Sequence, residues 1–519
     1  MPASTLPSPG RHLSSSEINR VPCHATASRW PPLIVAHHRA TPPDLDKPRA
    51  WCRIRGHIAR SFSTGRRTIV TSDDKVSAPD QGGRGNLVDR FFRLSAEGTT
   101  VGREAIAGVT TFLAMAYILF VNPSILGETG MDTDAIFVAT ALAAALGTLI
   151  MGLWARYPIA LAPGMGLNAF FAFTVVLTLG IPWQTALAGT LASGVLFFLL
   201  AVSGIREAII NAIPMQLKLA TGAGIGLFIA FIGLQAAGVV VNSDSTLVTL
   251  GDLTSAGTVL TAFGLLVTTL FLVRGIRGGV FYGMVLTAAA GVITGYIDPP
   301  NAVVSGVPSL APTFGEAITN IPELFTAQMA IVVFTMLFVD FFDTSGTLIA
   351  IANQAGLLRD GKLPRAMRAF TSDSVATVGG AVLGTSTTTS YIESSAGVAA
   401  GGRTGLTSVF TAVLFLLSLF FSPLLAVVTP EVTAPALIVV GVLMATGLGG
   451  IEWDKLEFAI PAFVMVIAMP LTYSIANGIA LGLIFYPLMM LFRGRWRDVH
   501  PALYVLLLVF LAYFIWFAA

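Results

Sequence analysis

Three acidic side chains lie inside segments of the chain that are otherwise apolar. Asp340 and Asp343 belong to the apolar run 327–357, and Glu393 follows the hydroxyl-rich stretch 384–390. A charge in the middle of a bilayer costs about 2.5–3.5 kcal/mol even on a lenient scale, so such acids face a cavity and indicate function. Carboxylates in that setting can accept N–H groups of a ligand, bind a cation or exchange a proton.

The first two acids share one face of a helix with hydroxyl groups. Positions 340, 343, 344 and 347 align at helical spacing, which gives an apolar helix a polar stripe. Asp340 would lie roughly 20 Å from position 327, near the centre of a membrane. The alternative is a structural acid that bonds hydroxyls and holds helices together.

Glu393 is predicted to open a short helix, and Asn168 ends another irregular stretch. The positive end of a helix dipole stabilises a carboxylate, so a purely structural role for Glu393 is an alternative. The Asn168 amide can donate to and accept from the same ligand. These segments contain no Lys or Arg, so the ligand is a cation, a proton or a neutral molecule rich in N–H donors. Burial favours the neutral form of a carboxyl, which makes proton coupling through Asp340 and Glu393 a further expectation.

Aromatic side chains near these acids offer flat apolar surfaces suited to a planar ring, although ordinary packing is the more common role of such residues. Asp373, five residues after Arg368, is interpreted as an interfacial partner or a helix cap. The aromatic candidates are Phe170, Phe171, Phe341, Phe342 and Tyr391.

The composition is that of a membrane protein. Of 519 residues, 54% are hydrophobic and 11% charged, with a net charge of +2 and a mean hydropathy of +0.78. Soluble domains carry about 25% charged residues, so a soluble enzyme, a disordered regulator and a nucleic-acid binder are excluded. Cys23, Cys52 and five of the six histidines precede residue 60. The apolar body therefore has no disulfide, zinc site or histidine relay, and we expect no cofactor or metal.

Residues 1–85 differ from the rest of the chain. They are rich in Ser, Pro and Arg, and 16 of the 30 basic residues lie at or before Arg103. We predict a disordered basic tail without a secretory signal, because no apolar core of adequate length is present. An organellar transit peptide is one alternative, and a start of translation near Val70 or Val76 is the interpretation that we favour.

The body is predicted to cross the membrane repeatedly. A membrane helix needs about 20 mainly apolar residues. The basic residues after Arg103 all fall at alternate connections, as expected of cytoplasmic loops. This pattern places the N terminus in the cytoplasm and predicts an all-α polytopic protein of about 14 spans, with an extra apolar helix at 501–518. The spans are expected at 104–124, 134–154, 164–179, 183–203, 215–237, 257–273, 278–296, 327–357, 366–384, 390–402, 406–428, 433–449, 457–474 and 476–492.

The third and tenth spans are predicted to be discontinuous. The stretch 157–168 contains two prolines and two glycines, which interrupt a helix. The stretch 384–393 holds four Thr and two Ser, which favour extended backbone before a short helix. Irregular backbone has to be buried or line a cavity. Its recurrence about seven spans apart indicates two inverted seven-span repeats with a transport site between them.

Several long strings, taken in order, are similar to those of one transporter family. They are GVTTFLAMAYILFVNPSIL, ALAPGMGLNAFFAF, FVDFFDTSGTL, GTSTTTSYIESSAGVAAGGRTGLTSV and AMPLTYSIANGI. From about Asn86 to the C terminus, the chain resembles the nucleobase:cation symporter 2 family in its adenine/guanine/hypoxanthine permease branch. The departures are the long tail and the extra apolar run after Pro501.

The resemblance implies, within a transporter region 86–519, a core domain (104–203 and 327–428) and a gate domain (215–296 and 433–492). It implies import of purine nucleobases with protons across the plasma membrane, by motion of the core against the gate. The acid of span eight carries over to Asp340, that of span ten to Glu393, and the amide of span three to Asn168. The expected substrate-binding residues are Asn168, Asp340, Asp343, Thr389, Ser390 and Glu393.

Other functions stay as alternatives. A transporter of related fold for uracil or xanthine is one. An anion exchanger would need a basic residue facing the half-helices, and a channel would not transport uphill. A membrane enzyme would need a nucleophile, metal site or cofactor motif, none of which is found in the apolar body. Sodium in place of protons and a homodimer also stay open, whereas no nucleic-acid partner is expected.

Overall fold

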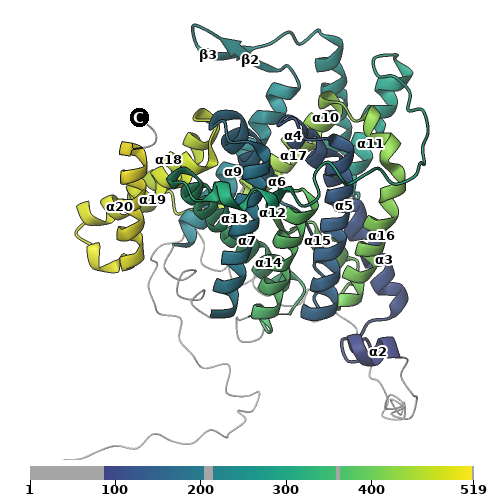
Figure 1. Ribbon diagram of the computed structural model, residues 1–519, viewed down its shortest axis with the longest axis horizontal. Helices are drawn as coiled ribbons and strands as arrows, with labels where there is room; N and C mark the ends of the chain where they lie inside the picture. The colour runs from purple at the N-terminus through teal and green to yellow at the C-terminus, as the bar shows by residue number, and fades with distance from the viewer. Residues whose placement is uncertain (1–86, 204–213, 358–362, 517–519) are drawn as a thin grey trace, which may run out of the picture. The chain divides into compact units, whose positions relative to one another are not determined.

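The computed structural model describes residues 87–203, 214–357 and 363–516. The predictions for residues 1–85, a disordered tail or a later start, lie outside the described residues. Arg84–Ala519 form one compact unit, whose described helices and strands are coloured in Figure 1.

The first half of this unit is a succession of apolar helices. Thr100, Asp132 and Ser255 each accept a backbone N–H at the start of a helix, which satisfies one of the free donors found there. The elements are α2 (Leu87–Phe92), α3 (Val101–Met115), α4 (Ile118–Gly127), α5 (Thr133–Ile150) with the π-helical turn η1 (Met151–Ala155), β1 (Leu161–Pro163), α6 (Met165–Ala169) with the π-helical turn η2 (Phe170–Thr178), α7 (Trp183–Ser203), α9 (Met215–Ala236), the hairpin of β2 (Val240–Ser243) and β3 (Leu247–Leu250), α10 (Ala256–Val273) and α11 (Gly279–Ile293).

The second half has the same character. Thr404 and Ser474 cap two of its helices with their side chains. The elements are α12 (Glu316–Thr319), η3 (Ile321–Leu324), α13 (Ala327–Gln354), α14 (Ala366–Leu383), β4 (Thr388–Ser390), α15 (Ser394–Ala399), α16 (Gly405–Ser418), η4 (Leu419–Val427), α17 (Pro430–Ala445), η5 (Thr446–Gly450), α18 (Leu456–Leu471), α19 (Ile475–Phe492), η6 (Trp496–Asp498) and α20 (Pro501–Trp516).

Each predicted span corresponds to a helix. Among the residues that the structure describes, nine helices are long and apolar enough to cross a membrane. Shorter apolar helices supply predicted spans three, seven and thirteen and the run after Pro501. Predicted span nine is α14, which has 18 residues but is more polar, and predicted span ten is α15, with six. The predicted all-α polytopic fold is confirmed.

Two short strands join the discontinuous spans. β1 precedes α6 and β4 precedes α15, and the strands pair antiparallel, with Ala162 opposite Thr389. The Gly164 N–H also donates to the Thr387 carbonyl at 2.9 Å. These bonds satisfy backbone groups that could find no water inside a membrane. The prediction of extended segments before short helices is therefore confirmed.

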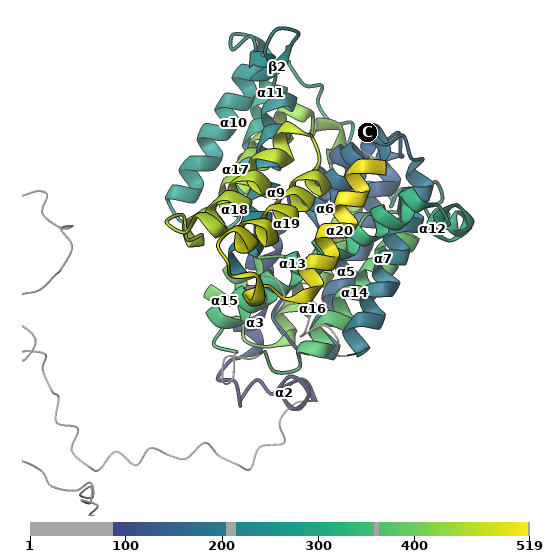
Figure 2. The same cartoon turned by 90° about the vertical axis from the view of Figure 1, so that its left-hand side faces the viewer.

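The described helices pack in two sets. α9 packs against α17 and α18, α10 against α11 and α17, and α18 against α19. Separately, α14 packs against α5 and α7, and α16 against α3 and α5. The two sets lie beside one another in Figure 2, and α13 contacts α7 of one set and α9 of the other. The division into a core and a gate domain, which concerns motion, stays a prediction.

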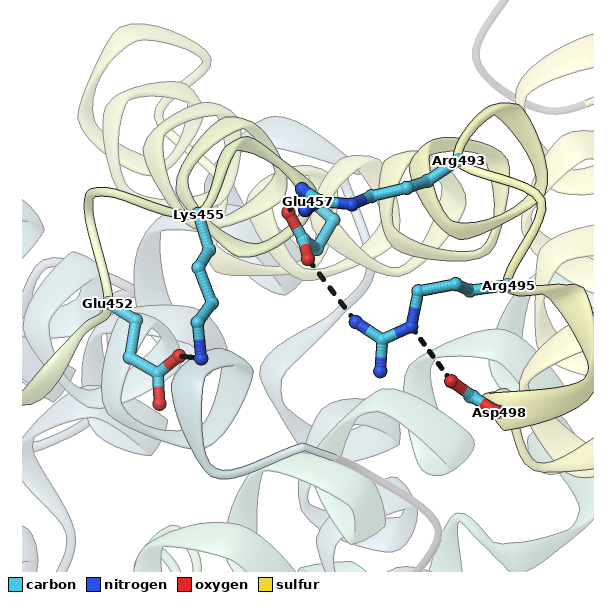
Figure 3. A network of polar contacts seen from close by, with 6 residues as sticks. All are labelled: Glu452, Lys455, Glu457, Arg493, Arg495 and Asp498. Atoms are coloured by element: carbon cyan, nitrogen blue, oxygen red, sulfur yellow. Dashed lines mark hydrogen bonds and ion pairs between the residues drawn. The ribbon is translucent and has the colours of Figure 1, made fainter.

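One buried acid connects the last three helices, as Figure 3 shows. Glu457, near the start of α18, is 2% exposed and pairs with Arg493 and Arg495 from the segment after α19. Arg495 also pairs with Asp498 at 2.8 Å. The connection between α19 and α20 is therefore attached to α18, and α20 then packs against α19.

Candidate functional site

The Thr344 hydroxyl in α13 contacts three other polar side chains. It lies 2.8 Å from Asp373 Oδ2 in α14 and 2.8 Å from the Thr389 hydroxyl in β4. Asp340 Oδ1, one turn earlier in α13, is 3.4 Å away. All four residues are buried. A hydroxyl has one proton to donate, so Thr344 donates a hydrogen bond to Asp340 or to Asp373 at any one time. Its contact with Thr389 also connects α13 to β4, the strand before Glu393.

Asp373 is also bonded to the end of that strand. The Ser390 hydroxyl donates to Asp373 Oδ1 at 3.3 Å. The prediction of an interfacial partner or cap for Asp373 is wrong, because the side chain lies inside α14 and is completely buried. A carboxylate away from water needs donors, and Thr344 and Ser390 supply them. The signal in the sequence was an acid between two serines within a helix that is otherwise rich in apolar residues.

Glu393, just after β4, is bonded to the first span. Its Oε1 accepts a hydrogen bond of 2.6 Å from the Tyr117 hydroxyl. Glu393 occupies the N-cap position of α15, but its side chain makes no capping bond there. The position at the start of α15 is compatible with the structural alternative, stabilisation of the carboxylate by the helix dipole, but no capping bond adds to it. Because a carboxylate accepts several donors, the bond to Tyr117 leaves capacity for a ligand.

Asp343 in α13 interacts with Glu393 at the start of α15. Both side chains are partly buried, and the Asp343 carboxylate interacts electrostatically with that of Glu393. Tyr391 interacts electrostatically with both acids. The structure thus brings together two predicted site acids that come from α13 and from the start of α15.

Asn168 presents a donor without a partner. Its side chain is buried in α6, and its Oδ1 accepts a hydrogen bond from the Ser386 hydroxyl. Its Nδ2 has no hydrogen-bond partner in the described part of the protein. A buried polar group left unsatisfied costs about 1–3 kcal/mol. This N–H group is therefore suited to an acceptor on a ligand, whereas the amide oxygen, which was also predicted to contact the ligand, is engaged by Ser386.

The two discontinuous spans approach closely at a glycine. A Cβ atom added at Gly164, the residue before α6, would lie 2.6 Å from Thr389 Cγ2. Real Cβ atoms do not approach a carbon this closely, so only glycine fits without a shift of the strands. Gly164 therefore permits the contact that brings Asn168 and the β4 residues into one region.

The aromatic candidates are engaged in packing and in backbone contacts. Phe341 packs edge-on against Phe197 of α7, with ring centroids 6.0 Å apart. The Tyr391 hydroxyl donates to the Pro163 carbonyl at 2.5 Å and supports the strand pair. Phe170 and Phe171 are also buried, and the side chain of Phe342 lies outside the described residues.

Sequence reasoning missed two further polar side chains. Tyr117 had no distinguishing signal, because one tyrosine in an apolar span is ordinary. Glu104, near the start of α3, is buried and accepts the backbone N–H groups of Arg403 and Thr404 and the hydroxyl of Thr407. Glu104 is thus a structural connection between α3 and the start of α16.

Comparison with known sequences gives matches over most of the chain. A sequence model of the Permease family matches residues 102–481. The guanine/hypoxanthine permease PbuG of Bacillus subtilis is 57% identical over 434 residues, which cover 82% of this chain and 99% of that protein. The adenine permease AdeQ of Escherichia coli is 45% identical over 426 residues, with 82% and 95% covered.

Comparison with solved structures concerns the fold. The transmembrane domain of the cyanobacterial bicarbonate transporter BicA matches with a TM-score of 0.56 at 14% identity, over 72% of this chain and 97% of that one. The murine anion transporter Slc26a9 in its inward-facing state matches with a TM-score of 0.54 at 10% identity, over 81% and 74%. These matches support the predicted inverted-repeat transporter fold.

Proposed function

The chain belongs to the permease family, in the purine branch of the nucleobase:cation symporters, and on that premise we propose that it imports hypoxanthine, adenine or guanine with protons across the plasma membrane. The observation that carries the proposal is the identity of 57% and 45% to purine permeases over almost their whole length. The protein is a multi-pass membrane transporter and not an enzyme. We place its N terminus in the cytoplasm on the distribution of Lys and Arg.

Recognition of a purine in this site would rest on complementary hydrogen bonds. The carboxylates of Asp343 and Glu393 would accept ring and exocyclic N–H groups of the base. The Nδ2 group of Asn168, which has no partner in the described part of the protein, would donate to a ring nitrogen or a carbonyl oxygen. A base that left one of these buried groups unpaired would be rejected strongly.

The other predicted site residues, Asp340, Thr389 and Ser390, would lie beside the bound base, in the cluster around Thr344. Asp340, Thr389 and Ser390 belong to one hydrogen-bonded cluster with Thr344 and Asp373. Substrate contacts of Thr389 and Ser390 are part of the proposal. Their position in β4 makes them neighbours in sequence of Glu393, and their hydroxyls lie at the cluster that contains Asp340.

Proton coupling would use carboxyl groups that interact with one another. When two acids are electrostatically coupled, binding of a proton by one changes the free energy of charging the other. Glu393 is coupled in this way to Asp343, and Asp340 shares the Thr344 hydroxyl with Asp373. A base bound through Glu393 would thereby alter proton binding within the site, which is what symport requires. Motion of the core helices against the gate helices would then alternate access.

The test is uptake of labelled hypoxanthine, adenine, guanine and uracil into cells deficient in purine uptake. We expect saturable purine uptake that collapses on addition of a proton uncoupler and does not depend on sodium. Preferential uptake of uracil would overturn the proposed substrate. Uptake that resists the uncoupler and requires sodium would overturn the proposed coupling ion while leaving the substrate in place.

A further inference from the structure

Three arginines at one end of the described bundle are stacked on aromatic rings. The guanidinium of Arg365 lies 4.8 Å from the ring centroid of Tyr157, and that of Arg368 lies 5.3 Å from the ring of Trp154. Arg156, between these two aromatic residues in sequence, lies 4.6 Å from the ring of Phe91. We call Arg156, Arg365 and Arg368, with the rings of Trp154 and Tyr157, the arginine patch.

The arginine patch has positive charge that no carboxylate of the described residues neutralises. Within the described residues, none of its arginines has an ion pair, although Arg493 and Arg495 elsewhere do. Arg365 and Arg368 are exposed. A guanidinium that stacks on a ring keeps its N–H edge open, and that edge matches the oxygens of a phosphate. The charge of the patch is therefore complementary to an anion.

Apolar side chains border these charges. Leu153, Trp154 and Met367 are 45%, 58% and 57% exposed. Exposed apolar residues of a membrane protein face acyl chains, and Trp is enriched where the acyl chains meet the headgroups. A molecule that covered both the arginine patch and the apolar side chains beside it would contain a phosphate and a hydrocarbon chain.

The backbone holds two of the arginines in place. Arg156, after η1, and Arg365, before α14, both adopt the left-handed conformation, with φ of 59°. This region is unfavourable for a residue with a Cβ atom and persists only where the surroundings enforce it. The Tyr157 side chain is equally fixed, because its hydroxyl donates to the Pro364 carbonyl. The patch is thus a built surface of defined geometry.

We propose that the arginine patch binds an anionic phospholipid of the cytoplasmic leaflet. The headgroup phosphate lies among the N–H edges of Arg156, Arg365 and Arg368, and an acyl chain lies along Leu153, Trp154 and Met367. The patch connects the end of the second span to the start of α14, the helix that contains Asp373. A bound lipid therefore contacts an element of the transport site from outside the bundle. The inference goes beyond the proposed transport of purines and does not depend on the identity of the substrate.

The test measures lipid binding to the purified full-length chain by native mass spectrometry. The probes are phosphatidylglycerol and phosphatidylcholine with the same acyl chains. We expect phosphatidylglycerol to bind more tightly. The double variant R365Q/R368Q should weaken phosphatidylglycerol binding about 25-fold, because each basic residue near an anionic headgroup contributes about fivefold. Binding of phosphatidylcholine should stay unchanged.

The matched control is R274Q/R277Q. Arg274 and Arg277 are exposed and stack on no ring among the described residues. This variant should lose much less phosphatidylglycerol binding than R365Q/R368Q does. Arg368→Gln alone, with a melting curve, provides a milder variant should the double variant fold poorly, and about a fivefold loss is expected. Equal binding of the two lipids, or equal losses in the two double variants, would overturn the proposal. Because transport is not the readout, failure here leaves the proposed function untouched.

Discussion

Asp343 and Glu393 approach one another from elements far apart in the sequence, and neither forms an ion pair within the described part of the chain. Two partly buried carboxylates that interact electrostatically need N–H groups, protons or a cation as partners. Tyr117 gives Glu393 one donor. Under the proposed function the remaining donors would come from the ligand, and an N–H-rich base would fit this site better than an anion.

Glu393→Gln removes the charge while keeping the size of the side chain. We expect purine uptake to fall at least about tenfold, because a hydrogen bond to a charged group contributes about 1.5–3 kcal/mol. Uptake is measured alongside the amount of protein in the membrane. Glu452→Gln, which changes a partly exposed acid paired with Lys455, is the control and should transport normally. Undiminished uptake by Glu393→Gln would remove this residue from the site.

Asp373→Asn tests the acid that the sequence analysis misjudged. The amide keeps one acceptor oxygen and replaces the other with an NH2 donor, so the hydroxyl of either Thr344 or Ser390 can no longer donate to this side chain. We expect uptake to fall roughly tenfold, in line with about 1–3 kcal/mol for a buried group left unsatisfied. Ser390→Ala removes only one donor and should cost less. A larger loss in Ser390→Ala than in Asp373→Asn would show that Asp373 does not organise the cluster.

Among the elements, the pair of β1 and β4 positions the two segments that carry Asn168 and Glu393. Each strand has three residues, too few to be stable alone. The close approach at Gly164 and the bond from Tyr391 to Pro163 hold the strands together. The positions of Asn168, after β1, and of Glu393, after β4, therefore both depend on this short strand pair.

Gly164→Ala should disrupt this contact. Its Cβ would lie 2.6 Å from Thr389 Cγ2, and such overpacking costs about 1–3 kcal/mol. We expect reduced uptake and a lower melting temperature. The second substitution Thr389→Ser deletes the methyl group concerned and should restore part of the stability of Gly164→Ala. Gly222→Ala, at a position with nothing within 4 Å, should have little effect on either quantity. If Thr389→Ser restored no stability, the clash with the Thr389 methyl group would not be the cause of the destabilisation by Gly164→Ala.

The connection between α18, α19 and α20 makes a separate prediction about stability. Glu457 is buried and shared by Arg493 and Arg495, whereas the pair of Glu452 and Lys455 is 40–48% exposed. Exposed pairs contribute about 0–1 kcal/mol and buried ones cost more to break. Glu457→Gln should therefore lower the melting temperature measurably and Glu452→Gln should not. Equal melting temperatures for these two variants would contradict the role given to Glu457.

For the whole molecule, local chemistry predicted the architecture well and the tertiary partners poorly. Prolines and glycines in 157–168 and hydroxyl residues in 384–393 act on their own backbone, so both breaks were predictable. The cost of burying a charge likewise singled out Asp340, Asp343 and Glu393. The bond from Tyr117 to Glu393 spans 276 positions, and no local pattern contains it. Asp373 was misjudged because its donors come from α13 and β4, although the serines on either side of it in the sequence were a local signal.

The protein is proposed to drive a purine base uphill with protons through the site of Glu393. The most direct measurement is accumulation of labelled hypoxanthine in proteoliposomes that contain the purified full-length chain, under an imposed pH gradient. We predict accumulation above the external concentration, abolished by an uncoupler and absent from Glu393→Gln. Hypoxanthine that only equilibrates across the membrane despite the gradient, or a Glu393→Gln variant that accumulates it as well as the unaltered chain, would contradict the account.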